Sequence, residues 1–264
     1  MSAQIEAIIR RAITKSIGEF AKKNLKKKAK FQVLDLIIPK ERKIRSIVGG
    51  LETSLGSTLW EPLAKELAKN NGFEVLQTKL QIPTIMPASL QNTLSNIIED
   101  RKSAHPSFVG ATSHDRIRDD CQRFVLSPIT QFTNAPTGFG VDIWLKKNGI
   151  NYFYDTKTVQ PNVGTLAKCM EQVLNWYSYF YSRYPTEQAV GRIVFPYNPH
   201  SGDFWNHTIN KGRPLDPSYE ALVGNEFWDF CSGQSETIEK IFASFDEIRE
   251  SGELSQTLEE LLEH

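Results

Sequence analysis

The stretch "GVDIWLKKNGINYFYDTKT", residues 140–158, decides the fold class that the sequence predicts. Two runs of β-type residues flank Asn148-Gly149, and such a dipeptide is the strongest short-range signal for a two-residue hairpin turn. A two-residue loop pairs Lys147 with Ile150, and the same register places Asp142 directly opposite Asp155. The stretch therefore predicts an antiparallel hairpin with two facing acids.

The facing acids indicate chemistry. Asp142 and Asp155 repel each other unless something neutralises them, and a hard divalent cation with oxygen ligands does so. Lys157 lies two residues after Asp155 and therefore on the same face of its strand. The alternative is a solvated edge hairpin with chance charges. The apolar and aromatic residues on both faces favour a buried hairpin, and with it a metal site.

An acid followed two residues later by lysine also occurs at Glu41 and at Asp100, but only Asp155 has a paired strand with a second acid. The hairpin resembles the signature of the PD-(D/E)xK nuclease superfamily, although Gly140-Val141 rather than proline precedes Asp142. The resemblance implies that Asp142 and Asp155 hold Mg²⁺, for which Mn²⁺ can substitute. The backbone carbonyl of Thr156 is then a candidate third ligand, and Lys157 orients or deprotonates the attacking water.

The resemblance also implies a further acid from an upstream helix. Glu52 is the first candidate, because it lies near the expected amino end of a helix among small residues. Glu61 is the competitor, nine residues on and thus on the opposite side of a regular helix. A surface glutamate is the ordinary alternative for either one.

Several other blocks, including "GGLETSLGSTLWEPLA", "FPYNPHSGDFW" and "NEFWDF", resemble type II restriction endonucleases of the TdeIII-like family, which cut GGNCC-type palindromes. This resemblance implies double-stranded DNA as substrate, a homodimer and a restriction-modification system in the cytoplasm of a prokaryote. The fold it implies is an α/β restriction-endonuclease-like fold, a mixed central sheet flanked by helices.

A long polar loop after residue 195 is the predicted base-reading element, since Asn, Lys and Arg make bidentate contacts in the major groove. Gln160 and Asn162, after the second hairpin strand, are further candidates for DNA contact, whereas Lys168 and Gln172 are expected on a solvent face. An alternative interpretation places the histidines of the loop in a ββα-type metal site. The loop residues concerned are Asn198, His200, Asp203, Asn206, His207, Lys211 and Arg213.

The rest of the chain predicts one endonuclease domain, 1–264, with a basic helical region 1–45, a catalytic core 46–196 and a loop and acidic helical region 197–264. Helices are expected over residues 5–20, from Gly49-Gly50 to Asn71-Gly72, and over 163–181. Strands are expected over 73–82 and 189–195, the latter joined to the hairpin by a crossover helix. Residues 83–140 give mixed signals.

Composition bounds the function. Net charge is +0 over 264 residues, but residues 1–45 are strongly basic and residues 216–264 strongly acidic, typical of an interaction face and a solvated tail. The basic run from Lys22 to Lys30 is a candidate phosphate contact. Three dispersed cysteines suggest neither disulfides nor a thiolate zinc site, and no apolar run predicts a membrane span.

Two other functions compete with a restriction endonuclease. A structure-specific repair or junction-resolving nuclease of the same fold would need no base-reading loop. A DNA-binding protein without catalysis would have no reason to keep facing acids and a lysine in an apolar hairpin.

Overall fold

The structure is a computed structural model that describes residues 3–25, 32–103, 109–157, 159–207 and 213–263. The backbone forms two compact units, which we call the sheet unit (residues 71–227) and the helical unit (residues 1–70 and 228–264). A compact unit is not in itself a separately folding domain, so the single endonuclease domain stays a prediction. None of the described helices is long and apolar enough to cross a membrane.

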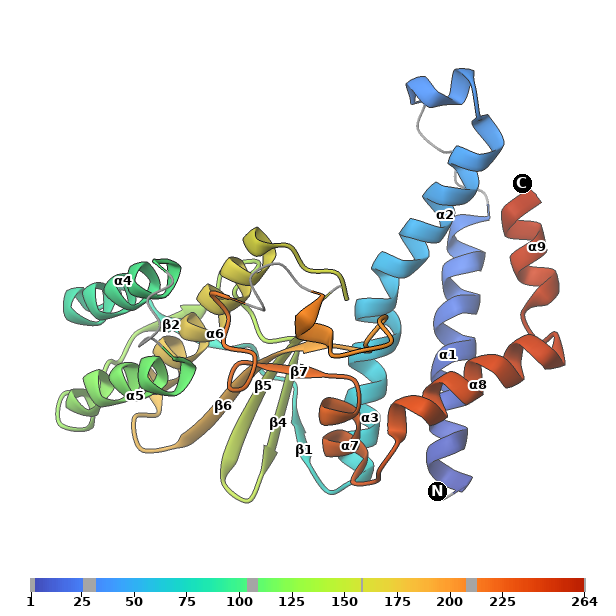
Figure 1. The fold of residues 1–264 in the computed structure, drawn as a ribbon. Coiled ribbons are helices and arrows are strands. Elements are labelled where there is room, and N and C mark those ends of the chain that lie inside the picture. The colour runs from blue at the N-terminus through green and yellow to red at the C-terminus, as the bar shows by residue number, and fades with distance from the viewer. Residues whose placement is uncertain (1–2, 26–31, 104–108, 158, 208–212, 264) are drawn as a thin grey trace. The chain divides into compact units, whose positions relative to one another are not determined.

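The sheet unit is built on a five-stranded mixed sheet of order β1-β4-β5-β6-β7 (Figure 1). Strand β4 is antiparallel to both β1 and β5, whereas β5, β6 and β7 are parallel, which confirms the predicted mixed sheet. The strands are β1 (Glu74–Leu76), β4 (Ile143–Lys147), β5 (Ile150–Thr156), β6 (Gln188–Phe195) and β7 (Ala221–Val223).

The predicted single strand over residues 73–82 is wrong. Strand β1 belongs to the main sheet, whereas β2 (Gln81–Pro83) pairs with β3 (Phe132–Asn134) in a separate two-stranded sheet. The residues between β1 and β2 redirect the chain from one sheet to the other, a change that an apolar pattern alone does not signal.

Helix α6 (Val163–Arg183) links β5 to the parallel strand β6, as predicted. Its apolar residues recur at three and four, and they cover the face of the sheet that carries Phe153. Helices α4 (Ala88–Lys102) and α5 (Gly110–Cys121) pack on α6, which lies between them and the sheet (Figure 1). Short turns η3 (Gln122–Val125) and η4 (Phe204–Asn206) complete this unit.

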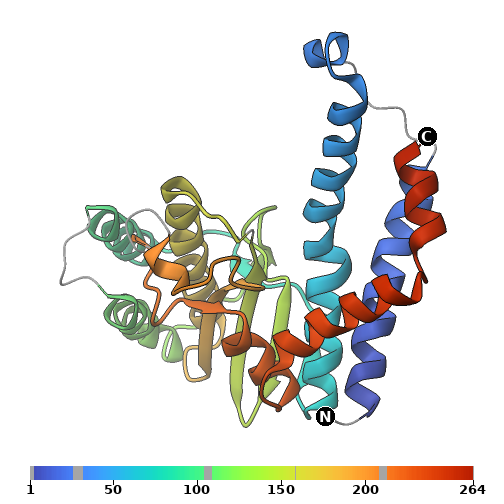
Figure 2. The same ribbon diagram turned by 45° about the vertical axis from the view of Figure 1, so that its right-hand side comes forward.

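The helical unit begins with α1 (Ala3–Asn24), the predicted first helix, which buries Ile5, Ile8, Ile9 and Ile13. Helix α8 (Thr237–Ser251) crosses α1, and α9 (Ser255–Glu263) runs beside it (Figure 2). Arg10 of α1 pairs with Glu247 at 3.4 Å and with Glu253 at 2.9 Å. The acidic end of the chain is therefore not a solvated tail as predicted, because part of its charge meets the basic first helix.

Helix α2 (Pro39–Leu55) begins about ten residues before the predicted start at Gly49-Gly50. Proline is favoured in the first turn of a helix, and the two glycines cost only about 1 kcal/mol each inside one. After a π-helical turn, Gly56–Trp60, α3 (Glu61–Asn70) ends directly before the turn at Asn71-Gly72, where Gly72 has a φ of +77°. The predicted helix end is thus confirmed. The remaining elements are η1 (Val33–Leu36) and α7 (Asn225–Ser232).

Candidate active site

The hairpin of β4 and β5 has the predicted turn and register. Asn148 and Gly149 have φ of 53° and 79°, as a type I′ turn requires, and Lys147 pairs with Ile150. The ladder runs to the pair Ile143 and Tyr154. Asp155 is the next residue of β5, whereas Asp142 directly precedes β4, so the predicted pairing of the two aspartates lies just beyond the ladder and stays a prediction.

Asp155 lies under helix α6 with a 4% exposed surface, because odd-numbered residues of β5 face that helix. Lys157 forms an ion pair with Oδ2 of Asp155, and Nε2 of Gln172 donates a hydrogen bond to the same oxygen at 2.6 Å. No described residue donates a hydrogen bond to Oδ1 of Asp155. The two donors thus fix the carboxylate and leave one oxygen for a further ligand.

Helix α6 also holds the backbone that leads to Asp142. Nε1 of Trp176 donates a hydrogen bond to the carbonyl of Gly140 at 3.0 Å, and Gln172 approaches the same oxygen at 3.5 Å. One helix therefore contacts both acidic segments. The expectation that Gln172 lies on a solvent face is wrong, since it is buried, while Lys168 one turn earlier is exposed.

The electrostatics of Lys157 include both acids. Burial by itself lowers the pKa of Lys157, but the carboxylates of Asp155 and Asp142 outweigh it, and the net pKa is raised above the ordinary value for lysine. Lys157 is therefore a cation at neutral pH. Cys169, on the neighbouring turn of α6, has its pKa raised to about 12 by burial, so it is a neutral thiol there.

The donor set fits a hard cation better than a soft one. Among the described residues, no group of three or more His, Cys, Asp or Glu side chains is placed to hold a metal ion. Asp142 is exposed and Asp155 has one oxygen that accepts no described hydrogen bond, so the hairpin offers two carboxylates. Mg²⁺ is commonly bound by one or two carboxylates with water and substrate phosphates, whereas structural zinc takes four protein ligands.

Glu52 belongs to the helical unit, in the last turn of α2 rather than near the start of a helix. Its side chain is exposed, and its role in the site stays a prediction. Glu61 is the first residue of α3, after the π-helical turn. Because that turn interrupts the regular helix, the argument that only one of the two glutamates can face the site no longer holds.

The two candidates after β5 have different surroundings. Asn162 is the N-cap of α6, and its Oδ1 accepts hydrogen bonds from the backbone N–H of Thr165 at 2.8 Å and from its hydroxyl at 3.1 Å. Gln160 is exposed. The cap explains why asparagine stands at position 162, and contact with DNA remains a prediction for both residues.

The predicted base-reading loop is organised by its own side chains. Asn198 donates to the carbonyl of Gly202 at 2.7 Å, and Asp203 accepts from the backbone of Trp205 and Asn206 at 2.7 and 3.1 Å. The side chains of both residues therefore stabilise the loop itself. Asn206, His207 and Arg213 are exposed, whereas Lys211 lies outside the described residues.

The histidines of this loop do not support the rival ββα-type site. His200 and His207 stack with ring centroids 4.2 Å apart, and Asp203 between them caps the turn η4. Within the part of the chain that the structure describes, these side chains do not form a group that could hold a metal ion. The hairpin remains the better candidate.

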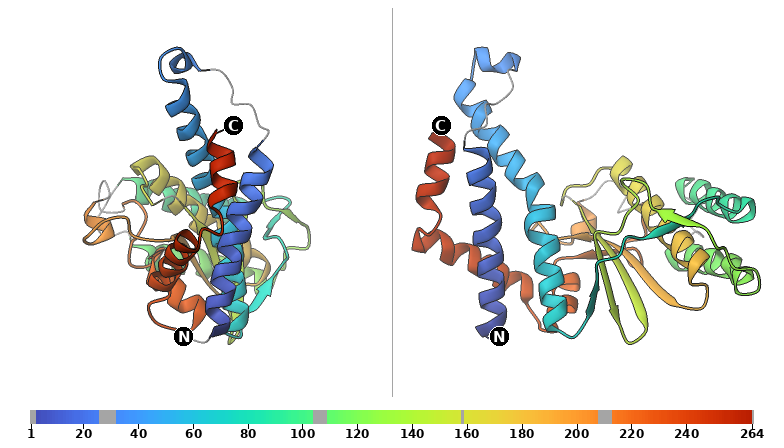
Figure 3. Two further views of the ribbon diagram at one scale, coloured as in Figure 1. Left: turned by 90° about the vertical axis from the view of Figure 1, so that its right-hand side faces the viewer. Right: turned by 180° about the vertical axis from the view of Figure 1, so that it is seen from behind.

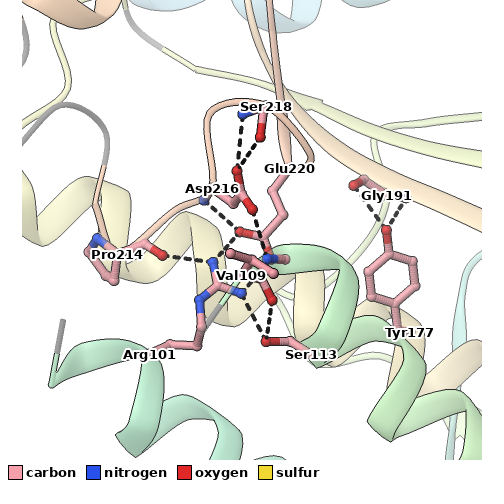
Figure 4. A network of polar contacts seen from close by, with 10 residues as sticks. Arg101, Val109, Ser113, Tyr177, Gly191, Pro214, Asp216, Ser218 and Glu220 are labelled. Atoms are coloured by element: carbon pink, nitrogen blue, oxygen red, sulfur yellow. Dashed lines mark hydrogen bonds and ion pairs between the residues drawn. The ribbon is translucent and has the colours of Figure 1, made fainter. Parts of the chain in front are cut away.

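A buried ion pair that the sequence did not predict lies at the far end of the loop (Figure 4). Arg101 of α4 contacts both carboxylate oxygens of Glu220, at 2.9 and 2.5 Å, and donates to the carbonyl of Pro214 at 2.7 Å and to Ser113 at 3.1 Å. Arg101 and Glu220 are 2% and 0% exposed. The segment after Arg213 is thus clamped to α4.

Helix α5 contributes a second clamp to the same segment. The backbone N–H of Gly110 donates to Asp216 at 2.8 Å, and a Cβ at Gly110 would lie 2.8 Å from the ring of Tyr219. Only glycine fits this approach. The signal in the sequence was Asp216 and Glu220 in an otherwise apolar segment, but nothing local identified Arg101 as their partner.

Comparisons with known proteins agree with these features. The model of the family described as type II restriction endonuclease, HinfI, matches residues 1–249. The type II restriction enzyme MjaII of Methanocaldococcus jannaschii is 24% identical over 202 residues, which are 73% of this chain and 51% of that enzyme. The chain thus spans about half the length of this curated relative. A search of the solved structures gave no significant match.

Proposed function

Because the chain belongs to the HinfI family of type II restriction endonucleases, we propose that it hydrolyses phosphodiester bonds in both strands of double-stranded DNA at a short palindrome. The observation that carries the proposal is the buried carboxylate of Asp155, held by Lys157 and Gln172 at the end of a hairpin that also bears Asp142. This arrangement supports the assignment to the PD-(D/E)xK superfamily.

The carboxylates of Asp142 and Asp155, with the backbone carbonyl of Thr156, are the proposed ligands of Mg²⁺. When bound, the cation polarises the scissile phosphate and makes water a better nucleophile. Oδ1 of Asp155 is the oxygen proposed to bind the cation, since Lys157 and Gln172 both contact Oδ2. Asp142 is exposed, which suits a carboxylate that binds the same cation as a phosphate of the DNA. Glu52 remains a proposed additional acid.

The raised pKa of Lys157 bears on which catalytic role this side chain can have. A lysine that stays protonated at neutral pH is a poor general base, so we assign it to orienting water and offsetting the charge that develops on the phosphate. We therefore propose the orienting role for Lys157 in preference to the deprotonating role that the sequence also allowed. Gln172 is then a positioning residue, because it acts on the carboxylate of Asp155 and not on the substrate.

Sequence recognition is assigned to the loop after β6, with Asn206, His207, Lys211 and Arg213 as the side chains offered to base edges. Gln160 and Asn162 are the proposed backbone contacts next to the site. The resemblance of several blocks to TdeIII-like enzymes supports a GGNCC-type palindrome. A palindrome cut on both strands needs two sites related by a two-fold axis, so the proposed assembly is a homodimer.

A plasmid of mixed sequence, incubated with the protein and Mg²⁺, tests this function. Discrete fragments are expected, and their sequenced ends give the recognised bases. A smear would favour a structure-specific nuclease, and intact plasmid would favour a DNA-binding protein without catalysis. Cleavage should stop in EDTA and return with Mg²⁺ or Mn²⁺, while Ca²⁺ should support binding without turnover, since it is a poorer activator of water.

A further inference from the structure

The helical unit exposes a mostly apolar segment, residues 33–38, interrupted only by Asp35, where η1 leads into α2. Val33, Leu36 and Ile37 are 72%, 74% and 77% exposed, and Leu34 and Ile38 are exposed as well. Single exposed apolar residues are ordinary, but several in succession are typical of an interaction surface. In Figure 3 η1 and the first turns of α2 extend past the ends of α1 and α9.

Helix α2 continues this surface. Ile44, Ile47, Val48, Leu51 and Leu55 recur at three and four residues, which is the pattern of a helix with one buried face. Yet none of the 17 residues of α2 is buried within the described chain. Four of the five apolar residues are half-buried and Val48 is 44% exposed, so part of the apolar face remains open to a partner that would cover it.

A groove on the same surface shows the chemistry of that partner. It has a volume of about 660 Å³ and is lined by Pro39, Lys40, Lys43 and Ile44 of α2 and by Glu259 and Leu262 of α9. One wall is basic, the other is acidic and the floor is apolar. DNA does not suit such a groove, because Glu259 would repel phosphates and the apolar residues would stay uncovered.

The surface is instead complementary to itself. A two-fold axis would bring the basic face of α2 in one copy against the acidic face of α9 in the other, and the reverse contact would form at the same time. The apolar residues would then fill the centre, as in homodimer interfaces, with the charges at the rim.

We propose that η1, α2 and α9 form the dimer interface of this protein, with a second copy of the chain as the occupant of the groove. The inference rests on the proposed function, because concerted cleavage of a palindrome requires two copies. The interface can be measured without DNA, so its failure and a failure of the nuclease function are distinguishable.

The first test is sedimentation of the full chain without DNA. The wild type should be a dimer, and the double variant Leu36→Glu/Ile37→Glu should raise the dimer dissociation constant by at least about thirtyfold, as expected for central apolar anchors. Leu126→Glu is the matched control, since Leu126 is 92% exposed but belongs to the sheet unit. Equal far-UV circular dichroism of all three proteins would show that folding is intact.

Charge reversal provides the sharper test. Lys40→Glu/Lys43→Glu makes both walls acidic, and Glu259→Lys/Glu260→Lys makes both walls basic, so each variant alone should dissociate. Mixing the two variants should restore a heterodimer, because each acidic wall then meets a basic one. If the charged walls instead interact only within one chain, mixing the two variants should not restore a dimer.

Three results would overturn the proposal. The wild type is a monomer at tens of micromolar, the apolar variant remains as dimeric as Leu126→Glu, or mixing fails to restore the dimer. A fourth contrary result is a loss of DNA affinity in Lys40→Glu/Lys43→Glu with an unchanged dimer, which would assign the surface to DNA.

Discussion

Two donors converge on one oxygen of Asp155, and this residue-scale detail could not be predicted from the sequence. Gln172 is 17 residues from Asp155, on a helix whose polar positions resemble a solvent face. The hairpin that carries Asp155 was predictable because a two-residue turn fixes its register locally. The partner of Asp155 depends on how α6 docks on the sheet, which no local pattern encodes.

The first prediction concerns Gln172. Gln172→Leu should lower the cleavage rate by about 10- to 100-fold and raise the Mg²⁺ concentration needed for half-maximal rate. The reason is that the carboxylate of Asp155 loses one of the two groups that fix its orientation. Affinity for cognate DNA in Ca²⁺ should stay within about twofold, since Gln172 is buried and its proposed role is to position Asp155.

The control is Asn175→Leu on the same helix, where the side chain bonds the carbonyl of Glu171 at 2.7 Å and not the site. Kinetics of the two variants over a range of Mg²⁺ concentrations provide the measurement. An equal loss in both would mean that Gln172 only supports the helix.

The second prediction concerns His114, whose ring nitrogens bond the hydroxyls of Tyr219 and Tyr181 at 2.7 and 2.8 Å. Burial lowers the pKa of His114 to about 4, with a smaller contribution from Arg118. The folded state therefore favours the neutral ring. Its stabilisation is complete above the unfolded pKa near 6.5 and is lost as pH falls toward 4.

The free energy of unfolding should fall over that window by on the order of 3 kcal/mol more in the wild type than in His114→Gln. Urea unfolding at a series of pH values measures it. Parallel pH profiles for the two proteins would show that this histidine does not sense protons in the fold.

At the scale of elements, several helices and strands defined by adjacent residues were predicted correctly, whereas contacts between distant residues were not. The hairpin, α6 and β6 follow from periodicity and turn chemistry over adjacent residues. Residues 83–140 resisted prediction because α4 and α5 are amphipathic toward α6, and their polar residues have distant partners. Arg101 and Glu220, for example, are 119 residues apart.

The third prediction concerns this ion pair. Arg101→Met should lower the free energy of unfolding by about 3–5 kcal/mol, because it leaves the carboxylate of Glu220 buried without its counter-charge. The double variant Arg101→Met/Glu220→Met should lose less than the single one. Denaturant unfolding measures both, and additive losses would mean that the pair is not coupled.

The fourth prediction concerns the loop that this pair anchors. Arg213→Ala should weaken binding to the cognate site by about 1–3 kcal/mol and leave non-cognate binding nearly unchanged, if Arg213 reads a base. If it contacts a phosphate, both affinities fall together and the salt slope drops by about one.

Lys22→Glu at the end of α1 supplies the comparison for a phosphate contact, since Lys22 is exposed in a basic turn. Binding titrations at several salt concentrations distinguish the two cases. The same behaviour in both variants would place base recognition outside this loop.

For the whole molecule, the charge distribution along the sequence indicated that the two ends differ, but not that they contact each other. The opposite charges of the two ends were taken as an interaction face and a tail, yet Arg10 joins α1 to the acidic carboxyl-terminal helices. The sequence predicted a mixed α/β fold and the structure confirms it. It predicted helices at both ends of the chain but not that they pack into one unit, because a three-dimensional contact between chain ends leaves no local pattern.

The central claim is that the acids of the hairpin form the active centre, and one measurement tests it most directly. Asp142→Asn, Asp155→Asn and Asp100→Asn are compared for plasmid cleavage in Mg²⁺. Asp100 is the control because it has the same acid–x–lysine spacing outside the hairpin, where it pairs with Arg116 at 3.3 Å.

Both hairpin variants should lose at least on the order of a hundredfold in rate while they still bind DNA, and Asp100→Asn should cleave like the wild type. Cleavage by Asp155→Asn at the wild-type rate, with Asp100→Asn inactive, would contradict the account.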